Sequence, residues 1–248
     1  MERRHTAAQA QAAFDAARAA GFTNISIDLV LGWPGETRAR WERTLREAAA
    51  LAPEHVSLYI LEVEGRTLLS HRQRRGLLVL PPDDLVADLY LDAVGALAAL
   101  GLERYEISNF ARPGFESRHN RKYWDDAPFL GLGLSAHSYL DGVRFWNRDT
   151  YGGYCRAIEE SGPHGARAGE RRASPREALG EALFTALRRR EGASLAALRE
   201  RYGIDPLEVF GEALRPSLEA GLVEQRADRL QLTERGILVS NEVFEAFV

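Results

Sequence analysis

The sequence is poor in sulfur and in lysine. Cys155 is the single cysteine among 248 residues, and Lys122 is the single lysine, so nearly every cation is an arginine. One thiol forms no internal disulfide, which is typical of proteins in a reducing compartment. It also excludes a zinc or iron–sulfur site ligated by this chain's cysteines alone, because such sites need three or four thiolates. We interpret Cys155 as a small buried hydrophobic residue rather than a reactive group.

Long apolar runs and an excess of positive charge are also missing. No stretch reaches the roughly 18 apolar residues of a membrane helix, and the N-terminus has no apolar core of a signal peptide. The formal net charge is −4, whereas proteins that bind nucleic acid through its phosphates are basic. We therefore expect a soluble, cytoplasmic protein with no membrane span and no nucleic-acid partner.

Residues 1–65 alternate helix and strand signals. A capping box precedes the helix-favouring residues 7–20. The β-rich segments 23–31 and 55–61 flank a second helix, whose apolar face is predicted to hold Trp41, Leu45 and Ala48. This alternation predicts parallel β/α units. Two strands do not make a stable sheet, so later strands or another polypeptide are expected to complete it.

Alternate residues of the first predicted strand differ in polarity. The apolar residues from Ile25 to Leu31 suit a helix layer, and Ser26, Asp28 and Val30 face the other way, as in a barrel interior that becomes polar. Asp28 lies toward the carboxyl end of the strand, where β/α folds bind ligands. Alternatively, its carboxylate caps or hydrogen-bonds a neighbouring loop.

The rest of the chain divides near residue 170. Residues 66–165 are predicted to hold a helix over 83–100 that buries Leu85, Leu89, Ala93, Leu97 and Leu100, then a strand over 102–107 and a polar loop over 112–128. Gly131 and Gly133 indicate close backbone packing rather than a phosphate-binding loop. Residues 161–173 are typical of a linker. Three helices, a hairpin and a final helix from 233 toward 248 make residues 174–248 similar to a winged-helix module. That module is not basic, so we expect docking or a lid role rather than DNA binding.

Six stretches together carry a family resemblance. They are RRH (3–5), NISIDLVLGWPG (24–35), PEHVSLY (53–59), YEISNFARPG (105–114), ESRHNRKYW (116–124) and LTERG (232–236) with Ser240-Asn241. In this order they resemble the radical SAM proteins grouped with oxygen-independent coproporphyrinogen III oxidase, and within that group the HemW-type haem-chaperone branch.

The resemblance implies an α/β fold, namely the C-terminal part of a radical SAM (β/α)6 partial barrel followed by a small helical winged-helix-like domain. Residues 1–65 would be the last two β/α units of that barrel, 66–165 a barrel extension with the HNxxY segment, and 174–248 the winged-helix-like domain. The family binds S-adenosylmethionine and a [4Fe–4S] cluster. Its Cys-x3-Cys-x2-Cys motif lies upstream of every matched stretch, so we expect an N-terminal truncation, either real or from a misplaced start.

The resemblance also implies site residues. Arg3 matches an arginine that donates to polar groups of the nucleoside, and Asp28 matches a carboxylate that accepts from ribose hydroxyls or the ammonium group. Val30 and Glu62 match positions lining the same S-adenosylmethionine pocket, although strand parity turns Glu62 toward the helices.

The segment from His119 to Tyr123 matches the HNxxY pattern associated with haem binding in the chaperone branch. His119 would ligate the haem iron, and Asn120 and Tyr123 complete the motif. Neighbouring cations would pair with the propionates and neighbouring aromatic rings would pack on the porphyrin, namely Arg118, Arg121, Lys122, Phe115 and Trp124. The alternative is that His119 only forms a hydrogen bond within a loop.

Three functions stay open. The first is a haem chaperone that binds haem or porphyrin and passes it to a haem-accepting protein. The second is an oxygen-independent coproporphyrinogen III oxidase, which performs an oxidative decarboxylation in porphyrin biosynthesis. The third is a non-catalytic remnant or interaction module. Because the chain lacks cluster ligands, we expect no radical chemistry from it alone and assign no catalytic residue.

Overall fold

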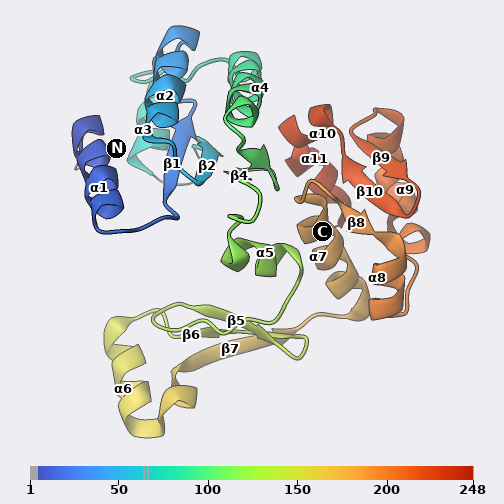
Figure 1. Cartoon of the computed structure of the whole chain (residues 1–248). Coiled ribbons are helices and arrows are strands. Elements are labelled where there is room, and N and C mark those ends of the chain that lie inside the picture. The colour runs from blue at the N-terminus through green and yellow to red at the C-terminus, as the bar shows by residue number, and fades with distance from the viewer. Residues whose placement is uncertain (1–4, 64, 66, 248) are drawn as a thin grey trace. The chain divides into compact units, whose positions relative to one another are not determined.

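The computed structural model describes residues 5–63, 65 and 67–247, and the chain divides into two compact units, residues 1–116 and 117–248 (Figure 1). Each unit has buried apolar residues of its own. The boundary falls inside the segment 66–165 that we treated as one part of the sequence, and the three-part division stays a prediction. None of the helices formed by the described residues is both long and apolar enough to cross a membrane.

The first unit is built on a mixed sheet with the strand order β1-β2-β4-β3. β1 (Ser26–Leu31) and β2 (His55–Ile60) are parallel, as predicted, with Asp28 opposite Ser57. β4 (Asn109–Ala111) pairs antiparallel with β2 and with β3 (Glu103–Arg104). Later strands of the same chain therefore extend the sheet beyond β2, and β1 forms its other edge.

Helices of the first unit follow the predicted pattern with small corrections. α1 (Ala7–Ala19) begins at the predicted capping box, and α2 (Arg38–Leu51) buries the three residues expected on its apolar face. α3 (Leu68–Arg74) is a short additional helix. α4 (Asp83–Ala99) buries Leu89, Ala93 and Leu97. Leu100 was wrongly placed in that stripe, because it is the residue that ends the helix and is 43% exposed.

The core of the first unit lies between the sheet and α2 and α4. Val56 and Leu58 of β2 and Phe110 of β4 are at most 1% exposed. The indole N–H of the buried Trp41 donates a hydrogen bond to the carbonyl oxygen of Leu89 at 2.9 Å, which joins α2 to α4.

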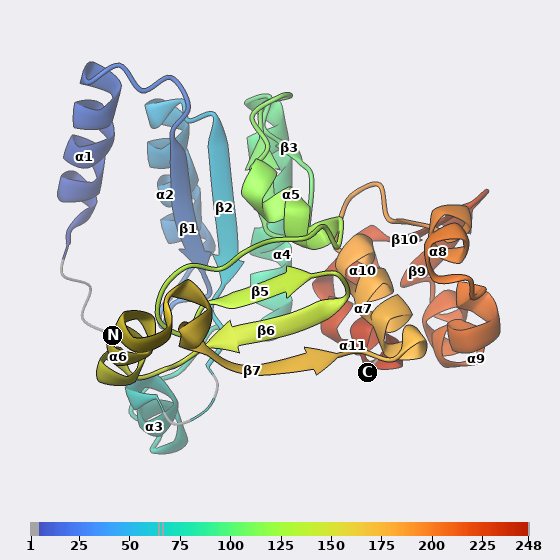
Figure 2. The ribbon, with the colours of Figure 1, turned by 90° about the horizontal axis from the view of Figure 1, so that it is seen from below.

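The second unit begins with elements that the sequence pattern did not predict. α5 (Arg118–Trp124) lies where we expected a polar loop. β5 (His137–Leu140), β6 (Val143–Asn147) and β7 (Arg167–Arg172) form an antiparallel sheet, with α6 (Tyr151–Ser161) at one end of it (Figures 1 and 2). The predicted linker over 161–173 is therefore wrong. It contains the end of α6, a short 3-10 helix over Pro163–Ala166 and all of β7.

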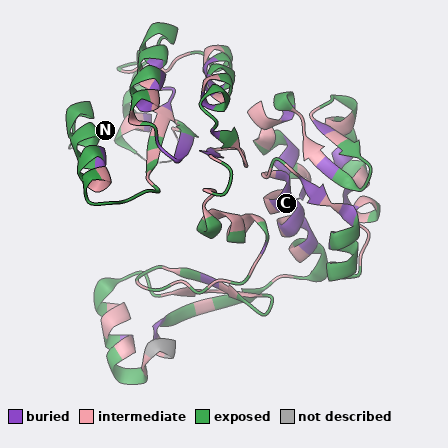
Figure 3. Cartoon of the chain, in the orientation of Figure 1, coloured by how far each residue is buried: buried purple, intermediate pink, exposed green. Residues whose placement is uncertain are grey.

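The wrong linker over 161–173 and the missed helix α5 each have a physical reason. Five of the six residues of β7 are exposed, so the strand has no apolar alternation, and its pairing with β6 satisfies its backbone instead. α5 is seven residues long, and its main start signal is Ser117, whose hydroxyl accepts from the amide of Asn120 at 3.2 Å. Figure 3 shows how little of the β5–β6–β7 sheet is buried.

The C-terminal part of the second unit matches the predicted winged-helix-like pattern. It comprises α7 (Pro175–Leu187), β8 (Ala193–Ser194), α8 (Leu195–Tyr202), α9 (Pro206–Glu219), β9 (Val223–Arg226), β10 (Arg229–Leu232), α10 (Glu234–Leu238), α11 (Ser240–Phe244) and a 3-10 turn over Glu245–Phe247. Leu179, Leu183 and Leu187 of α7 are fully buried, and much of this helix is coloured as buried in Figure 3. The single final helix was wrong, since Val239, at φ −123°, separates α10 from α11.

Candidate functional site

Asp28, Val30 and Glu62, three of the four residues suggested for S-adenosylmethionine, lie on or next to β1 and β2. Arg3 lies outside the described residues. Asp28 is exposed and Val30 half-buried, and both line a groove of about 510 Å³ bordered by α1 and α2. Glu36 also lines it, and partial burial raises the pKa of this carboxyl above its usual range although Arg40 lowers it. Glu62 is exposed just beyond β2 and is not among the residues that line the groove.

A histidine that we did not single out lies beside Asp28. His55 is 5% exposed, with Nδ1 2.8 Å from the hydroxyl of Ser26 and Nε2 2.9 Å from the hydroxyl of Tyr105. Burial lowers the pKa of His55, and the carboxylate of Asp28 opposes that shift. The imidazole is therefore neutral at pH 7. Strand pairing brings these groups together, because His55 lies opposite Ser26.

The residues present fit part of the cofactor set that the resemblance implies. The carboxylate of Asp28 is an exposed acceptor of the kind that ribose hydroxyls or an ammonium group need. A [4Fe–4S] cluster does not fit, because these 248 residues contain one thiol. In the described part of the chain, no group of three or more His, Cys, Asp or Glu residues is placed to hold a metal ion.

The HNxxY residues lie on helix α5 of the second unit. His119 is exposed, while Asn120 and Tyr123 are half-buried. His119 and Tyr123 are four residues apart and so share one side of the helix. Their ring centroids are 4.9 Å apart with an interplanar angle of 89°, an edge-to-face contact. The motif therefore presents an accessible imidazole that is supported by a neighbouring aromatic ring.

Tyr123 also lines a cavity of about 490 Å³ within the second unit. Its apolar walls include Trp124, Phe129 and Phe184. The rings of Tyr123 and Phe129 are 4.7 Å apart in an edge-to-face contact. The guanidinium of Arg188 lies 4.7 Å from the ring centroid of Trp124. Within the described residues, the buried indole N–H of Trp124 has no acceptor.

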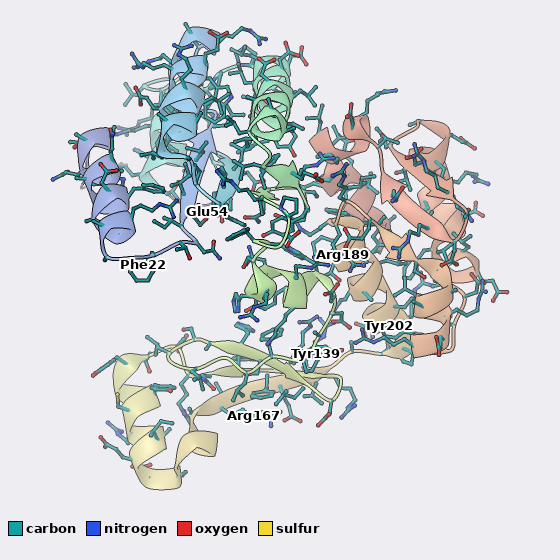
Figure 4. All side chains as sticks on the ribbon, in the orientation of Figure 1. Phe22, Glu54, Tyr139, Arg167, Arg189 and Tyr202 are labelled. Carbon is teal, nitrogen blue, oxygen red and sulfur yellow. The ribbon has the colours of Figure 1, made fainter. Side chains whose placement is uncertain are left out.

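A buried carboxylate lies at the polar end of this cavity. Asp126 is 7% exposed and accepts hydrogen bonds from the hydroxyl of Tyr202 at 2.7 Å and from Nη2 of Arg201 at 2.8 Å. The hydroxyl of Tyr139 donates to it at 3.4 Å, and Figure 4 labels both tyrosines. Burial and the hydrogen bond to Asp126 raise the pKa of Tyr202 far above its usual range, so this hydroxyl stays protonated and donating.

Two further cavity residues come from distant parts of the chain. Arg144 of β6 donates from Nε to the carboxylate of Glu181 of α7 at 2.8 Å. Phe115, which we expected to pack on a porphyrin with Trp124, belongs to the first unit, whereas Trp124 belongs to the second. Tyr123 and Trp124 were named from the sequence and line the cavity, whereas Arg144 and Glu181 carried no motif.

Comparisons with known proteins agree with the resemblance. A family profile described as the HemN C-terminal domain matches residues 173–239. The haem chaperone HemW of Bacillus subtilis is 36% identical over 236 residues, which cover 95% of this chain and 62% of the relative. The haem chaperone HemW of Escherichia coli is 30% identical over 253 residues, which cover 100% of this chain and 64% of the relative.

One solved structure shares the fold. It is coproporphyrinogen III oxidase (HemN) from Escherichia coli, a radical SAM enzyme, which matches with a TM-score of 0.77 and 21% identity over 99% of this chain and 59% of that chain. The predicted fold class is thereby confirmed. The chain spans about three fifths of the length of the curated relatives it matches.

Proposed function

We propose that this chain, which is similar to the bacterial haem chaperones called HemW, binds haem through His119 and delivers it to a haem-accepting protein. The observation that carries the proposal is the accessible imidazole of His119 on α5, next to an aromatic cavity. A neutral imidazole is a good axial ligand of haem iron.

The neighbours of His119 support this role. Arg118 and Lys122 are exposed on the same short helix, where they can pair with the propionates of a bound haem. The ring of Tyr123 contacts the imidazole at 4.9 Å, and a contact that orders the imidazole in advance reduces the freedom lost when iron binds. Asn120 is half-buried beside His119 and completes the motif.

The S-adenosylmethionine contacts form the second part of the proposal. Asp28 and Val30 support it, because both line one groove. We propose Arg3 and Glu62 as further contacts on the resemblance alone. The cluster thiolates are not among these residues, so we assign no radical step to this chain.

Oxidative decarboxylation of coproporphyrinogen III is the second candidate, and the structural likeness to HemN favours it. Identity favours the chaperone, because the HemW proteins of Bacillus subtilis and Escherichia coli are 36% and 30% identical to this chain and HemN is 21% identical.

Titration with haemin, followed by Soret absorbance, tests the proposal. We expect saturable one-to-one binding that weakens at least tenfold in His119→Ala, which corresponds to about 1.4 kcal/mol. His137→Ala is the matched control, because His137 is also an exposed histidine of the second unit and lies outside α5. Equal affinities of the wild-type chain and His119→Ala would remove His119 from the role, and so would an equal loss in both variants.

A further inference from the structure

We propose that the cavity beside α5 holds one edge of the porphyrin macrocycle, so that the chain binds porphyrins whether or not they contain iron. The proposal rests on the proposed function and adds a second attachment point to the same site. It assigns a ligand to four aromatic residues, Tyr123, Trp124, Phe129 and Phe184, of which Tyr123 alone belongs to the HNxxY motif.

The cavity has the size and walls of a small-molecule site. Its volume of about 490 Å³ lies within the roughly 300–1,000 Å³ of ligand pockets. Residues behind the cavity wall support its aromatic rings. The ring of Phe184 packs edge-to-face on Phe244 at 4.7 Å, and the guanidinium of Arg188 lies over the ring of Trp124. Flat aromatic surfaces held in this way favour a flat, conjugated ligand.

Tyr123 connects the cavity to the iron ligand. Its ring contacts His119 at 4.9 Å and Phe129, in the cavity wall, at 4.7 Å. The imidazole therefore lies about one ring away from the cavity, and a ligand that uses both must be wide and planar. A porphyrin meets this condition, because its metal lies at the centre of the ring and its edge extends beyond it.

The polar end of the cavity offers a donor to a ligand carboxylate. Nε and Nη2 of Arg144 contact Glu181 at 2.8 and 2.7 Å. The side chain of Arg144 is 35% exposed. Nη2 of Arg144 also lies 3.8 Å from Asp126, and among the described residues Nη1 of Arg144 forms no hydrogen bond. Glu181 is shared with Arg171 at 2.9 Å, and Asp126 is paired with Arg201, so cations offset both carboxylates there. The geometry suits a propionate, which an arginine binds with a charge-assisted hydrogen bond.

Metal-free protoporphyrin IX is the probe that separates the cavity from the iron ligand. We would titrate it into the full chain and follow tryptophan quenching and porphyrin fluorescence. His119→Ala should bind it within about twofold of the wild-type chain, and Thr185→Trp, which fills the cavity from α7, should bind it at least tenfold more weakly. Ala197→Trp is the matched control, because Ala197 is exposed on α8 and does not line the cavity.

A second variant keeps the test valid if Thr185→Trp does not fold by circular dichroism. Arg144→Gln should weaken protoporphyrin IX at least threefold and leave its dimethyl ester, which has no carboxylate, unchanged. Wild-type affinity in a folded Thr185→Trp would overturn the cavity proposal, as would binding of haemin without binding of the metal-free porphyrin. In both cases the proposed function would still hold if haemin binding is weakened by His119→Ala. Absence of haemin binding to the wild-type chain would remove both.

Discussion

Replacing Asp126 with alanine should cost the second unit roughly 3–4 kcal/mol of its free energy of unfolding. Asp126 is 7% exposed and accepts a 2.7 Å hydrogen bond from Tyr202, and such a bond to a charged group contributes about 1.5–3 kcal/mol. Arg201 is 46% exposed, so its ion pair with Asp126 adds at most about 1 kcal/mol. The backbone at residue 126 is left-handed, with φ 47°, which costs alanine about 1 kcal/mol more.

Asp141 provides a matched control for the backbone contribution. It is also an aspartate with a left-handed backbone, at φ 52°, but it is exposed. Asp141→Ala should therefore cost about 1 kcal/mol, close to the strain alone. Asp126→Asn should lie between the two, because it keeps an acceptor and tolerates the left-handed backbone but loses the charge.

Hydrogen exchange measured by mass spectrometry is the suitable assay, because amides of β5 and α8 report the second unit without the first. We expect these amides to exchange roughly a hundredfold faster in Asp126→Ala than in Asp141→Ala, which corresponds to about 2.8 kcal/mol. Equal exchange rates in the two variants would refute the reasoning, because the carboxylate would then contribute nothing beyond its backbone conformation.

Two further predictions concern stability. Desolvation would raise the pKa of Glu54, but hydrogen bonds from the amide of Ile25 and from Arg18 lower it below the usual value. A lowered acid pKa stabilises the fold above the unfolded value of about 4.3. Glu54→Gln should thus cost roughly 1 kcal/mol at pH 7 and less as the pH falls through the lowered pKa of Glu54, as urea denaturation at pH 7 and at acidic pH would measure. An equal cost at both pH values would contradict this. Gly131→Ala should cost roughly 2 kcal/mol in urea denaturation, because its Cβ would lie 2.1 Å from the carbonyl oxygen of His137. Gly152 on α6 has open space around the position of a Cβ, so Gly152→Ala should be neutral or stabilising. A larger loss of stability in Gly152→Ala than in Gly131→Ala would contradict this prediction.

The sequence predicted those elements whose signals are local. The predicted capping box before residues 7–20 starts α1 at Thr6, and a second capping box starts α7 at Ser174. The predicted alternation of β1 agrees with its burial, because Ser26 and Asp28 are exposed and Leu31 is buried. In β2, by contrast, His55 and Ser57 are buried as well as Val56 and Leu58. The sheet β5–β6–β7 was missed because almost all of its residues are exposed or half-buried, so its strands show no apolar alternation.

The candidate site was predicted only as far as it is contiguous in sequence. His119, Asn120 and Tyr123 form a motif that can be recognised along the chain. The cavity beside them takes residues from β6 and α7, far along the chain from the motif, and strand pairing and helix packing alone bring these together. The relative orientation of His119 and Tyr123 was also missed. A loop was expected, and it is the helix α5 that places both side chains on the same side.

The single lysine of the chain has a practical consequence. Lys122 is exposed on α5, between the histidine and the tyrosine of the motif. An amine-directed dye can therefore be attached at one side chain next to the haem motif without mutagenesis, with the terminal amine as the other reactive group. A lysine-specific protease has a single cleavage point in the whole sequence, and cutting there requires α5 to unwind. A ligand bound at the site should slow cleavage at Lys122, so the intensity of the uncut band on a gel reports ligand binding.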